Sequence, residues 1–294
     1  MPQPRSHGTP RPTVAAGIVI VMLAMVAIPA AVALYSVVTP ATVQAVKGAS
    51  PHGYTWSLLL FVIPIVVIGV WFLPSEGLDV PQKAFWRTIG ILAPALGRWV
   101  PIEEYFFYLT GFITILLLYV WLSEYWLAAY TVEDYRGEAR ALPRLLQFHP
   151  TSLIVAGVLI GEGFVYKKYF SDVRDGWPGY LIVLVLGGLT PAMSFYPATK
   201  RFINWRALSM TMFFIMLVSM LWEATLALPY GWWNYQHRAM MGVFIGAWCD
   251  LPIEAVLVWL AVSYGTVILF EAVKIRQASG RPMREMMIGE ASGR

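Results

Sequence analysis

The stretch Pro101-Ile102-Glu103-Glu104-Tyr105-Phe106-Phe107 opens an apolar segment that continues to about residue 123. A second triplet, Pro252-Ile253-Glu254, opens a similar segment that ends near residue 273. Each segment is long enough to cross a bilayer as a helix, which takes about 20 residues. Proline at the first helical position and acids in the first turn are typical of a helix start. The two motifs therefore predict two membrane-spanning helices that begin in the same way.

The rest of the chain is equally apolar. Hydrophobic residues make up 58% of the 294 residues and charged residues 13%, whereas a soluble domain carries about a quarter charged residues. Two short apolar stretches, 85–99 and 239–250, reach only about half way across a hydrocarbon core as helices. We predict an all-α integral membrane protein with about 7–9 transmembrane helices. The further segments of spanning length are 14–38, 54–73, 151–168, 178–196 and 205–226.

The first apolar run, 14–38, has two interpretations. Arg5 and Arg11 precede it, and Ala31-Val32-Ala33 resembles a signal-peptidase site. The run is about 25 residues long, which exceeds the apolar region of a signal peptide and suits a spanning helix. We interpret it as a retained first helix, with cleavage as the alternative.

An internal repeat divides the chain into two halves. The Pro-Ile-Glu triplets stand 151 residues apart, and at the same offset Arg87 matches Arg238 and Trp71 matches Trp222. Each half would consist of a long helix, a short one, and a long helix opened by Pro-Ile-Glu. The predicted order is an N-terminal tail and first transmembrane helix (1–50), a first repeat (51–125), a charged linker with two connecting helices (126–199), a second repeat (200–275) and a flexible C-terminal tail (276–294).

Several classes of function are excluded by what the sequence lacks. One cysteine, Cys249, rules out an internal disulfide, a thiolate zinc site and a CxxC redox pair. No histidine stands at metal-ligand spacing from another, and no glycine-rich dinucleotide or phosphate-binding motif occurs. The net charge of +4 is not organised as a basic stripe interleaved with aromatics. We therefore expect no metal, no cofactor and no nucleic acid, and a lipid bilayer as the surroundings.

Glutamates inside apolar segments are the candidate functional groups, because an ionisable side chain at membrane depth is costly. The short stretches before both triplets place Glu103, Glu104 and Glu254 within the predicted membrane region. Glu103 shares a helix face with Phe106 and Phe107, whereas Glu104 points about 100° away on a regular helix. An ordinary helix start remains the alternative explanation for both motifs.

Two further acids lie in predicted spans. Glu162 precedes Lys167 and Lys168, which favours an ion pair at the level of the lipid headgroups. Glu223 is a second candidate, because it follows Trp222 and precedes the aromatic run 230–235. That run is either a belt at the membrane interface or a set of rings that face Glu254.

At these residues the sequence resembles the membrane-integral lycopene cyclases, which occur as two small subunits or as one fused chain. The family carries a Pro-x-Glu-Glu motif at the start of a helix in each half, with a stretch containing Trp and Tyr upstream. Pro101-Ile102-Glu103-Glu104 matches this motif, and Leu251-Pro252-Ile253-Glu254-Ala255 matches except at its last position. The resemblance covers roughly 50–125 and 200–275.

The resemblance implies a proton-initiated cyclisation of the ψ-end of a carotene, without net redox and without a cofactor. It implies that Glu103, Glu104 and Glu254 handle the protons, with donor and acceptor not assigned. Glu223, which its position in the sequence singles out, is the next candidate if the Pro-Ile-Glu acids only start helices. A hydrophobic polyene would be the substrate, and aromatic rings would stabilise the carbocation. The rings expected to line the substrate site are those of Phe106, Phe107, Trp222, Tyr230, Trp233 and Tyr235.

Other functions stay open at this point. Another cofactor-free carotenoid or terpenoid end-group enzyme would use the same residues. A repeat with broken helices and intramembrane acids is also typical of a secondary transporter. A prenyltransferase is disfavoured, because the five aspartates form no diphosphate-binding cluster. In every case we expect a protein integral to a bacterial cytoplasmic membrane.

Overall fold

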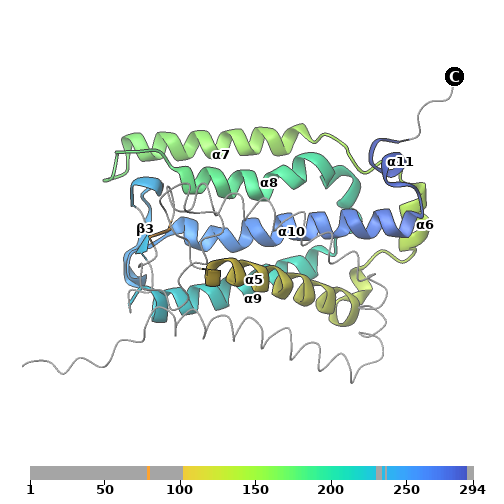
Figure 1. Ribbon diagram of the computed structural model, residues 1–294, viewed down its shortest axis with the longest axis horizontal. Coiled ribbons are helices and arrows are strands. Elements are labelled where there is room, and N and C mark those ends of the chain that lie inside the picture. The colour runs from red at the N-terminus through yellow and green to blue at the C-terminus, as the bar shows by residue number, and fades with distance from the viewer. Residues whose placement is uncertain (1–77, 80–101, 230–233, 236, 290–294) are drawn as a thin grey trace, which may run out of the picture.

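The computed structural model of the chain describes residues 78–79, 102–229, 234–235 and 237–289. Long helices make up most of this part (Figure 1). They are α5 (Ile102–Trp121), α7 (Pro150–Tyr169), α8 (Gly179–Thr199), α9 (Trp205–Trp222) and α10 (Ile253–Ser279).

Short elements connect the long helices. Two α-helices are short, α6 (Tyr135–Ala141) and α11 (Met283–Ile288). Helices α5 and α9 each end in a π-helical turn, Leu122–Trp126 and Glu223–Ala227 respectively. Single 3₁₀ turns are Ala128–Tyr130, His237–Ala239 and Gly246–Trp248. The two-residue strands are β1 (Leu78–Asp79), which pairs with β2 (Asn234–Tyr235), and β3 (Phe244–Ile245), which pairs with β4 (Leu251–Pro252); both pairs are antiparallel.

Four helical segments are long and apolar enough to cross a membrane: Leu109–Trp126, Gly179–Thr199, Trp205–Thr225 and Ile253–Ser279. They agree with the predicted all-α integral membrane protein and with four of its predicted spans. Helix α7 occupies the predicted span 151–168. The predicted elements at 14–38, 54–73 and 85–99 lie outside the described residues, so the total of 7–9 helices and the repeat remain predictions.

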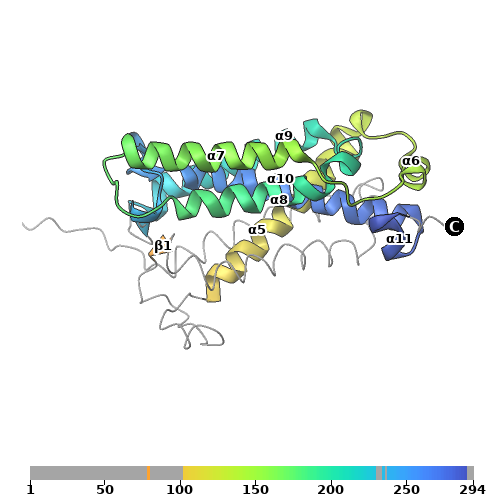
Figure 2. The ribbon, with the colours of Figure 1, turned by 90° about the horizontal axis from the view of Figure 1, so that it is seen from above.

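Helix α10 lies at the centre of the described bundle. Helix α8 packs along one side of it with α7 outside, and α9 and α5 pack on the other side (Figures 1 and 2). Gly188 of α8 sits so close to Ala261 of α10 that an added Cβ would come within 3.1 Å of its Cα. Small residues at such a crossing let two membrane helices approach closely. The apolar core is formed around α10 by Phe112, Leu116, Leu184, Leu208, Trp259 and Phe270.

The two ends of the bundle differ in structure. Helices α5, α8 and α10 run in one direction, and α7 and α9 run in the other (Figure 1). One end, here called the cap end, carries the cap, defined as residues 234–235 and 237–252. The opposite end, here called the linker end, carries α6, the linker before α7, and α11.

The predicted short helix over 239–250 is wrong. These residues form a 3₁₀ turn and the hairpin in which Phe244 pairs with Pro252 and Ile245 with Leu251. Gly242 has φ of 102°, and Cys249 and Asp250 have φ of 55° and 56°. Three residues in the left-handed region cannot continue a right-handed helix. The stretch is apolar, as the prediction assumed, but an apolar composition does not determine these backbone dihedral angles.

The C-terminal segment is ordered further than we predicted. Helix α10 continues to Ser279, and α11 follows. Met286 is fully buried, and its carbonyl oxygen accepts a hydrogen bond from the Leu145 N–H at 2.8 Å. The segment therefore packs on the linker before α7, so residues 276–289 are part of the fold.

Basic residues of the described part gather at the linker end. Cytoplasmic loops of membrane proteins carry an excess of Lys and Arg, which favours the linker end as the cytoplasmic side. The linker-end residues are Arg136, Arg140, Arg144, Lys200, Arg201, Arg206, Lys274, Arg276, Arg281 and Arg284, and those of the cap end are Lys167, Lys168, Arg174 and Arg238.

Cys249 gives a direct test of this orientation. It is the single cysteine of the chain, it is exposed, and it lies in the cap. We expect a membrane-impermeant maleimide to label it in intact spheroplasts, because the cap end would face away from the cytoplasm. The measurement is the thiol label on the purified protein.

A cysteine at the opposite end provides the control. Cys249→Ser should abolish labelling, and Cys249→Ser combined with Arg284→Cys should be labelled only after lysis. The reverse pattern would show that the cap end faces the cytoplasm.

Candidate active site and the buried carboxylates of helix α10

Glu254 lies in the first turn of α10 and is fully buried. Pro252, the residue just before the helix, is extended, with φ of −68° and ψ of 143°. The helix therefore begins at the next residue, Ile253. Oε1 of Glu254 accepts a short hydrogen bond from the backbone N–H of Met241. Oε2 has no hydrogen-bond partner within the described part of the chain. The side chain therefore presents one bound and one unbound carboxyl oxygen in a position without exposure to solvent.

The cap brings Met241 to this carboxylate. The Ile253 N–H donates to the carbonyl oxygen of Val243 at 3.0 Å, and the β3–β4 pairing folds the intervening hairpin back on itself. Gly242 lies against Ser171, whose Oγ would be 1.9 Å from an added Cβ. With φ of 102°, this position also suits glycine conformationally. A side chain at 242 would push the neighbouring Met241 amide away from Glu254.

A second buried carboxylate at the cap end is Glu223, which is 5% exposed. Its Oε1 accepts a hydrogen bond from the Tyr235 hydroxyl at 2.8 Å. The ring of Tyr235 meets that of Tyr180 edge-on, with centroids 6.5 Å apart. Among the described residues of the predicted aromatic run, Tyr235 binds a carboxylate, and that carboxylate is Glu223. The side chain of Trp222 and the residues Tyr230 and Trp233 lie outside the described part.

The first Pro-Ile-Glu motif is described only in its backbone. Helix α5 begins at Ile102, as predicted, but the side chains of Glu103, Glu104, Phe106 and Phe107 lie outside the described part. Helices α5 and α10 begin at the same end of the bundle (Figure 1), and α5 diverges from α10 toward its start (Figure 2).

An aromatic contact fixes the relative level of the two helices. The rings of Tyr119 and Phe270 meet edge-on with centroids 6.3 Å apart. Tyr119 lies 17 residues after Ile102, and Phe270 lies 17 residues after Ile253. Both helix starts are therefore about 25 Å before this contact. The two motifs lie at a similar level of the bundle, as a shared site requires.

Lys167 is a cap-end residue whose role the sequence did not reveal. We expected Lys167 and Lys168 to form an ion pair with Glu162 at the headgroups. Instead Glu162 is exposed and Lys167 is 2% exposed, and no ion pair joins them within the described part. The Lys167 ammonium donates to the carbonyl oxygens of two cap residues, His237 at 3.4 Å and Met240 at 2.6 Å, and to that of Val173 at 3.1 Å. A lysine in the last turn of a helix is ordinarily a surface residue, so sequence alone gave no signal.

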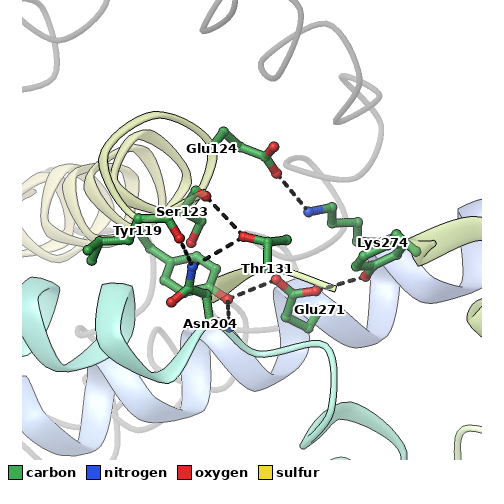
Figure 3. A network of polar contacts seen from close by, with 9 residues as sticks. Tyr119, Ser123, Glu124, Thr131, Asn204, Glu271 and Lys274 are labelled. Carbon is green, nitrogen blue, oxygen red and sulfur yellow. Dashed lines mark hydrogen bonds and ion pairs between the residues drawn. The ribbon is translucent and has the colours of Figure 1, made fainter. Parts of the chain in front are cut away.

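The linker end of α10 holds another carboxylate that the sequence analysis did not single out. Glu271 is 1% exposed, and its two oxygens accept hydrogen bonds from the hydroxyls of Tyr119 at 2.9 Å and Tyr135 at 2.8 Å (Figure 3). Burial raises the pKa of the Tyr135 phenol well above its usual value, and the charge of Glu271 raises it further. Tyr135 therefore remains a hydrogen-bond donor. The sequence did offer a signal for Glu271, because it is an acidic residue inside the predicted span 252–273.

The network around Glu271 joins several elements. The Tyr119 hydroxyl accepts from the Asn204 N–H at 3.1 Å, and the Asn204 side chain donates to the Leu127 carbonyl oxygen at 2.8 Å. Asn204 Oδ1 also accepts from the Ala207 N–H, which caps α9. Lys274 pairs with Glu124 at 3.2 Å (Figure 3). Both oxygens of Glu271 are thus satisfied by tyrosines that hold the helices together.

No match to this chain was found among protein-family models, curated proteins or solved structures. Among the described residues, no group of three or more His, Cys, Asp or Glu side chains is arranged to hold a metal ion. A buried carboxyl group with one unbound oxygen can donate or accept a proton.

The Glu271 network predicts a large effect on stability. Glu271→Ala leaves two buried phenol hydroxyls without their acceptor, and each such loss costs about 1–3 kcal/mol. We expect a clear drop in the thermal unfolding temperature of the detergent-purified protein. Tyr135→Phe should cost less, about 0.5–1.5 kcal/mol, because it removes one hydrogen bond.

Glu285→Gln is the matched control for this prediction. Glu285 of the partly exposed α11 pairs at 3.8 Å with Arg281, which precedes the helix, and such pairs contribute about 0–1 kcal/mol. Equal unfolding temperatures for Glu271→Ala and Glu285→Gln would contradict the structural role of the network.

Proposed function

We propose that this chain is a carotenoid cyclase of a bacterial cytoplasmic membrane, which closes the acyclic ψ-end of a lycopene-type polyene to a β-ionone ring. The observation that carries the proposal is the burial and hydrogen bonding of the Glu254 carboxyl group. It is fully buried at the start of a spanning helix, and its Oε2 has no partner among the described residues. Proton transfer to or from an apolar substrate needs such a carboxyl oxygen, kept away from water.

The reaction requires one proton to enter and one to leave. A carboxylic acid protonates the terminal double bond, which leaves a tertiary carbocation. The neighbouring double bond attacks this cation and closes the ring. A base then removes a proton beside the new cation, so the product is an isomer of the substrate. The buried rings of Tyr180 and Tyr235 lie at the cap end, and rings of this kind stabilise cations.

The resemblance to the membrane-integral lycopene cyclases supports the same assignment. Its two motifs open helices α5 and α10, which begin at the same end of the bundle. Glu103 and Glu104 in the first motif and Glu254 in the second are the proposed proton-handling groups. A cavity between the two helix starts would hold the end of the polyene, and the long apolar chain would lie along the membrane.

Ring formation in a lycopene-accumulating host tests the proposal. The wild-type chain should convert lycopene to a cyclic product that pigment chromatography resolves. Glu254→Gln keeps the shape of the side chain but removes its proton transfer, so ring formation should fall by about 10²–10⁴-fold. Glu103→Gln and Glu104→Gln should also be impaired.

Glu162→Gln is the control, because Glu162 is exposed on α7, away from the proposed site. It should retain nearly full activity at equal protein abundance in the membrane. Near-normal ring formation by both Glu103→Gln and Glu254→Gln would show that the Pro-Ile-Glu motifs only start helices and have no catalytic role. A wild-type chain that never produces a ring would defeat the proposal and favour the transporter alternative.

The chemistry also predicts independence from redox cofactors and divalent metal. Because the product is an isomer of the substrate, no electron acceptor or donor is consumed. We expect washed membranes treated with EDTA, and free of added flavin and nicotinamide, to keep forming rings. A strict requirement for reduced flavin or Mg²⁺ would contradict a purely carboxylate-driven mechanism.

A further inference from the structure

Glu254 is closed off from the surroundings of the protein in this structure. Its side chain is 0% exposed, and Oε2, the oxygen that would exchange a proton with the substrate, is buried with it. Direct proton transfer requires the carboxyl oxygen and the reacting atom to lie about 2.6–3.2 Å apart. The end of a polyene can therefore reach Oε2 only after some part of the protein has moved.

A single layer of chain separates Glu254 from the exterior at the cap end. Met241, whose N–H binds Oε1 of Glu254, is itself partly exposed. The other residues of 241–245 are also partly exposed, and residues 246–250 are exposed. We call residues 241–252 the cap hairpin. This hairpin lies over the start of α10 (Figure 1), with one side on Glu254 and the other outside the bundle.

The cap hairpin is paired mainly with itself. Strands β3 and β4 form its stem, and the hydrogen bond from the Ile253 N–H to the Val243 carbonyl oxygen continues this pairing by one step. Its ends lie at Gly242, which has φ of 102°, and at the start of α10. Loop residues and the ends of elements are the positions that absorb hinge motion. The hairpin can therefore move outward with its own pairing intact.

Two polar contacts join the cap hairpin to helices within the described part. One is the hydrogen bond from Met241 to Glu254. The other joins Cys249 to α9, where its Sγ lies 3.9 Å from the carbonyl oxygen of Ala224. A thiol is a weak donor. Outward movement of the hairpin thus breaks one amide hydrogen bond and one weak contact.

The base of the cap hairpin is fixed to α7. Met240, the residue before the hairpin, is fully buried, and its carbonyl oxygen accepts a hydrogen bond from Lys167 Nζ at 2.6 Å. The same ammonium group binds the carbonyl oxygen of His237 at 3.4 Å. These hydrogen bonds hold the residue next to Met241. They therefore set the position in which the hairpin lies over Glu254.

Exposed aromatic side chains surround this end of the bundle. Trp and Tyr are enriched at membrane–water interfaces. One of the exposed rings, Trp248, belongs to the cap hairpin itself. The hairpin thus lies at the level of the bilayer surface, where the end of a polyene dissolved in the membrane can reach it. The rings are those of Tyr169, Phe170, Trp177 and Trp248.

We propose that the cap hairpin is a lid, which opens to admit the end of the polyene to Glu254 and closes over it for the reaction. The entrance to the proposed site is then at the cap end. The identity of the substrate rests on the proposed function, whereas the opening is a property of the chain alone. Closure keeps water away from the carbocation, which water would otherwise capture.

Thiol labelling at position 254 measures the opening and needs no ring formation. In a Cys249→Ser background, Glu254→Cys places the single thiol of the chain beneath the hairpin. N-ethylmaleimide, which crosses membranes, should label this thiol to completion through local opening, but more slowly than it labels exposed Cys249 in the wild-type chain. Ala192→Cys in the same background is the buried control. Ala192 is 0% exposed in the core of the bundle, so its thiol should stay unlabelled.

The anchor at the base of the hairpin predicts the direction in which labelling changes. Lys167→Met should raise the labelling rate at position 254 by about 10–100-fold, the range expected for lost hydrogen bonds of a charged group. Lys168→Met is the matched control, because Lys168 is the exposed neighbour, and it should leave the rate unchanged. A general loss of folding would expose the thiol of Ala192→Cys as well. Equal rates in Lys167→Met and Lys168→Met would overturn the anchoring role.

A reversible lock tests whether the reaction needs the opening. Ala224→Cys introduces a partner for the native Cys249 across the edge of the hairpin. Oxidised membranes should lose ring formation, and dithiothreitol should restore it. Ala224→Cys combined with Cys249→Ser cannot form the disulfide and should stay active under both conditions.

The outcomes separate the lid from the cyclase function. A wild-type chain that forms no ring defeats the cyclase function, and labelling at position 254 still decides the lid. A thiol at position 254 that stays as unreactive as that of Ala192→Cys would overturn the lid. Full ring formation by the disulfide-linked protein, with the link verified by its resistance to alkylation, would overturn it too. If the disulfide does not form, the labelling decides alone.

Discussion

Every polar group placed inside a membrane bundle needs a partner, and helix α10 carries two buried carboxylates that meet this constraint differently. At the linker end, both oxygens of Glu271 accept hydrogen bonds from tyrosines. At the cap end, Glu254 has one oxygen bound by an amide and one unbound within the described part. An unsatisfied buried oxygen costs stability, and an unbound carboxyl oxygen is available to exchange a proton. The satisfied carboxylate holds helices together, and the unsatisfied one is the candidate for chemistry.

The same constraint accounts for Lys167. A spanning helix satisfies its own backbone, but an irregular segment at membrane depth must be satisfied by the surrounding protein. The cap is irregular, and the Lys167 ammonium binds two of its carbonyl oxygens, those of His237 and Met240, together with that of Val173 in the loop after α7. A lysine ammonium group is suited to this because it has three hydrogen-bond donors. The position of the irregular cap therefore depends on the Lys167 side chain.

The parts that sequence predicted are those with a strong local pattern. The spans that became α5, α8, α9 and α10 follow from apolar length, and the two Pro-Ile-Glu triplets correctly marked helix starts. The hairpin in the cap was missed because its left-handed residues, such as Cys249, have no apolar signature. The roles of Lys167 and Tyr119 were missed because they depend on partners about 70 and 152 residues away. No spacing rule reaches across such distances.

Ala255 connects the sequence pattern to the electrostatics of the site. It is 2% exposed and packs within the apolar core, where a glutamate would bury a further charge. The second motif thus has one acid, Glu254, and the first motif has two adjacent acids, Glu103 and Glu104. The proposed proton-initiated isomerisation needs both an acid and a base. The two Pro-Ile-Glu motifs differ at the position of Ala255, which is Glu104 in the first motif, so the same kind of functional group has different neighbours in each.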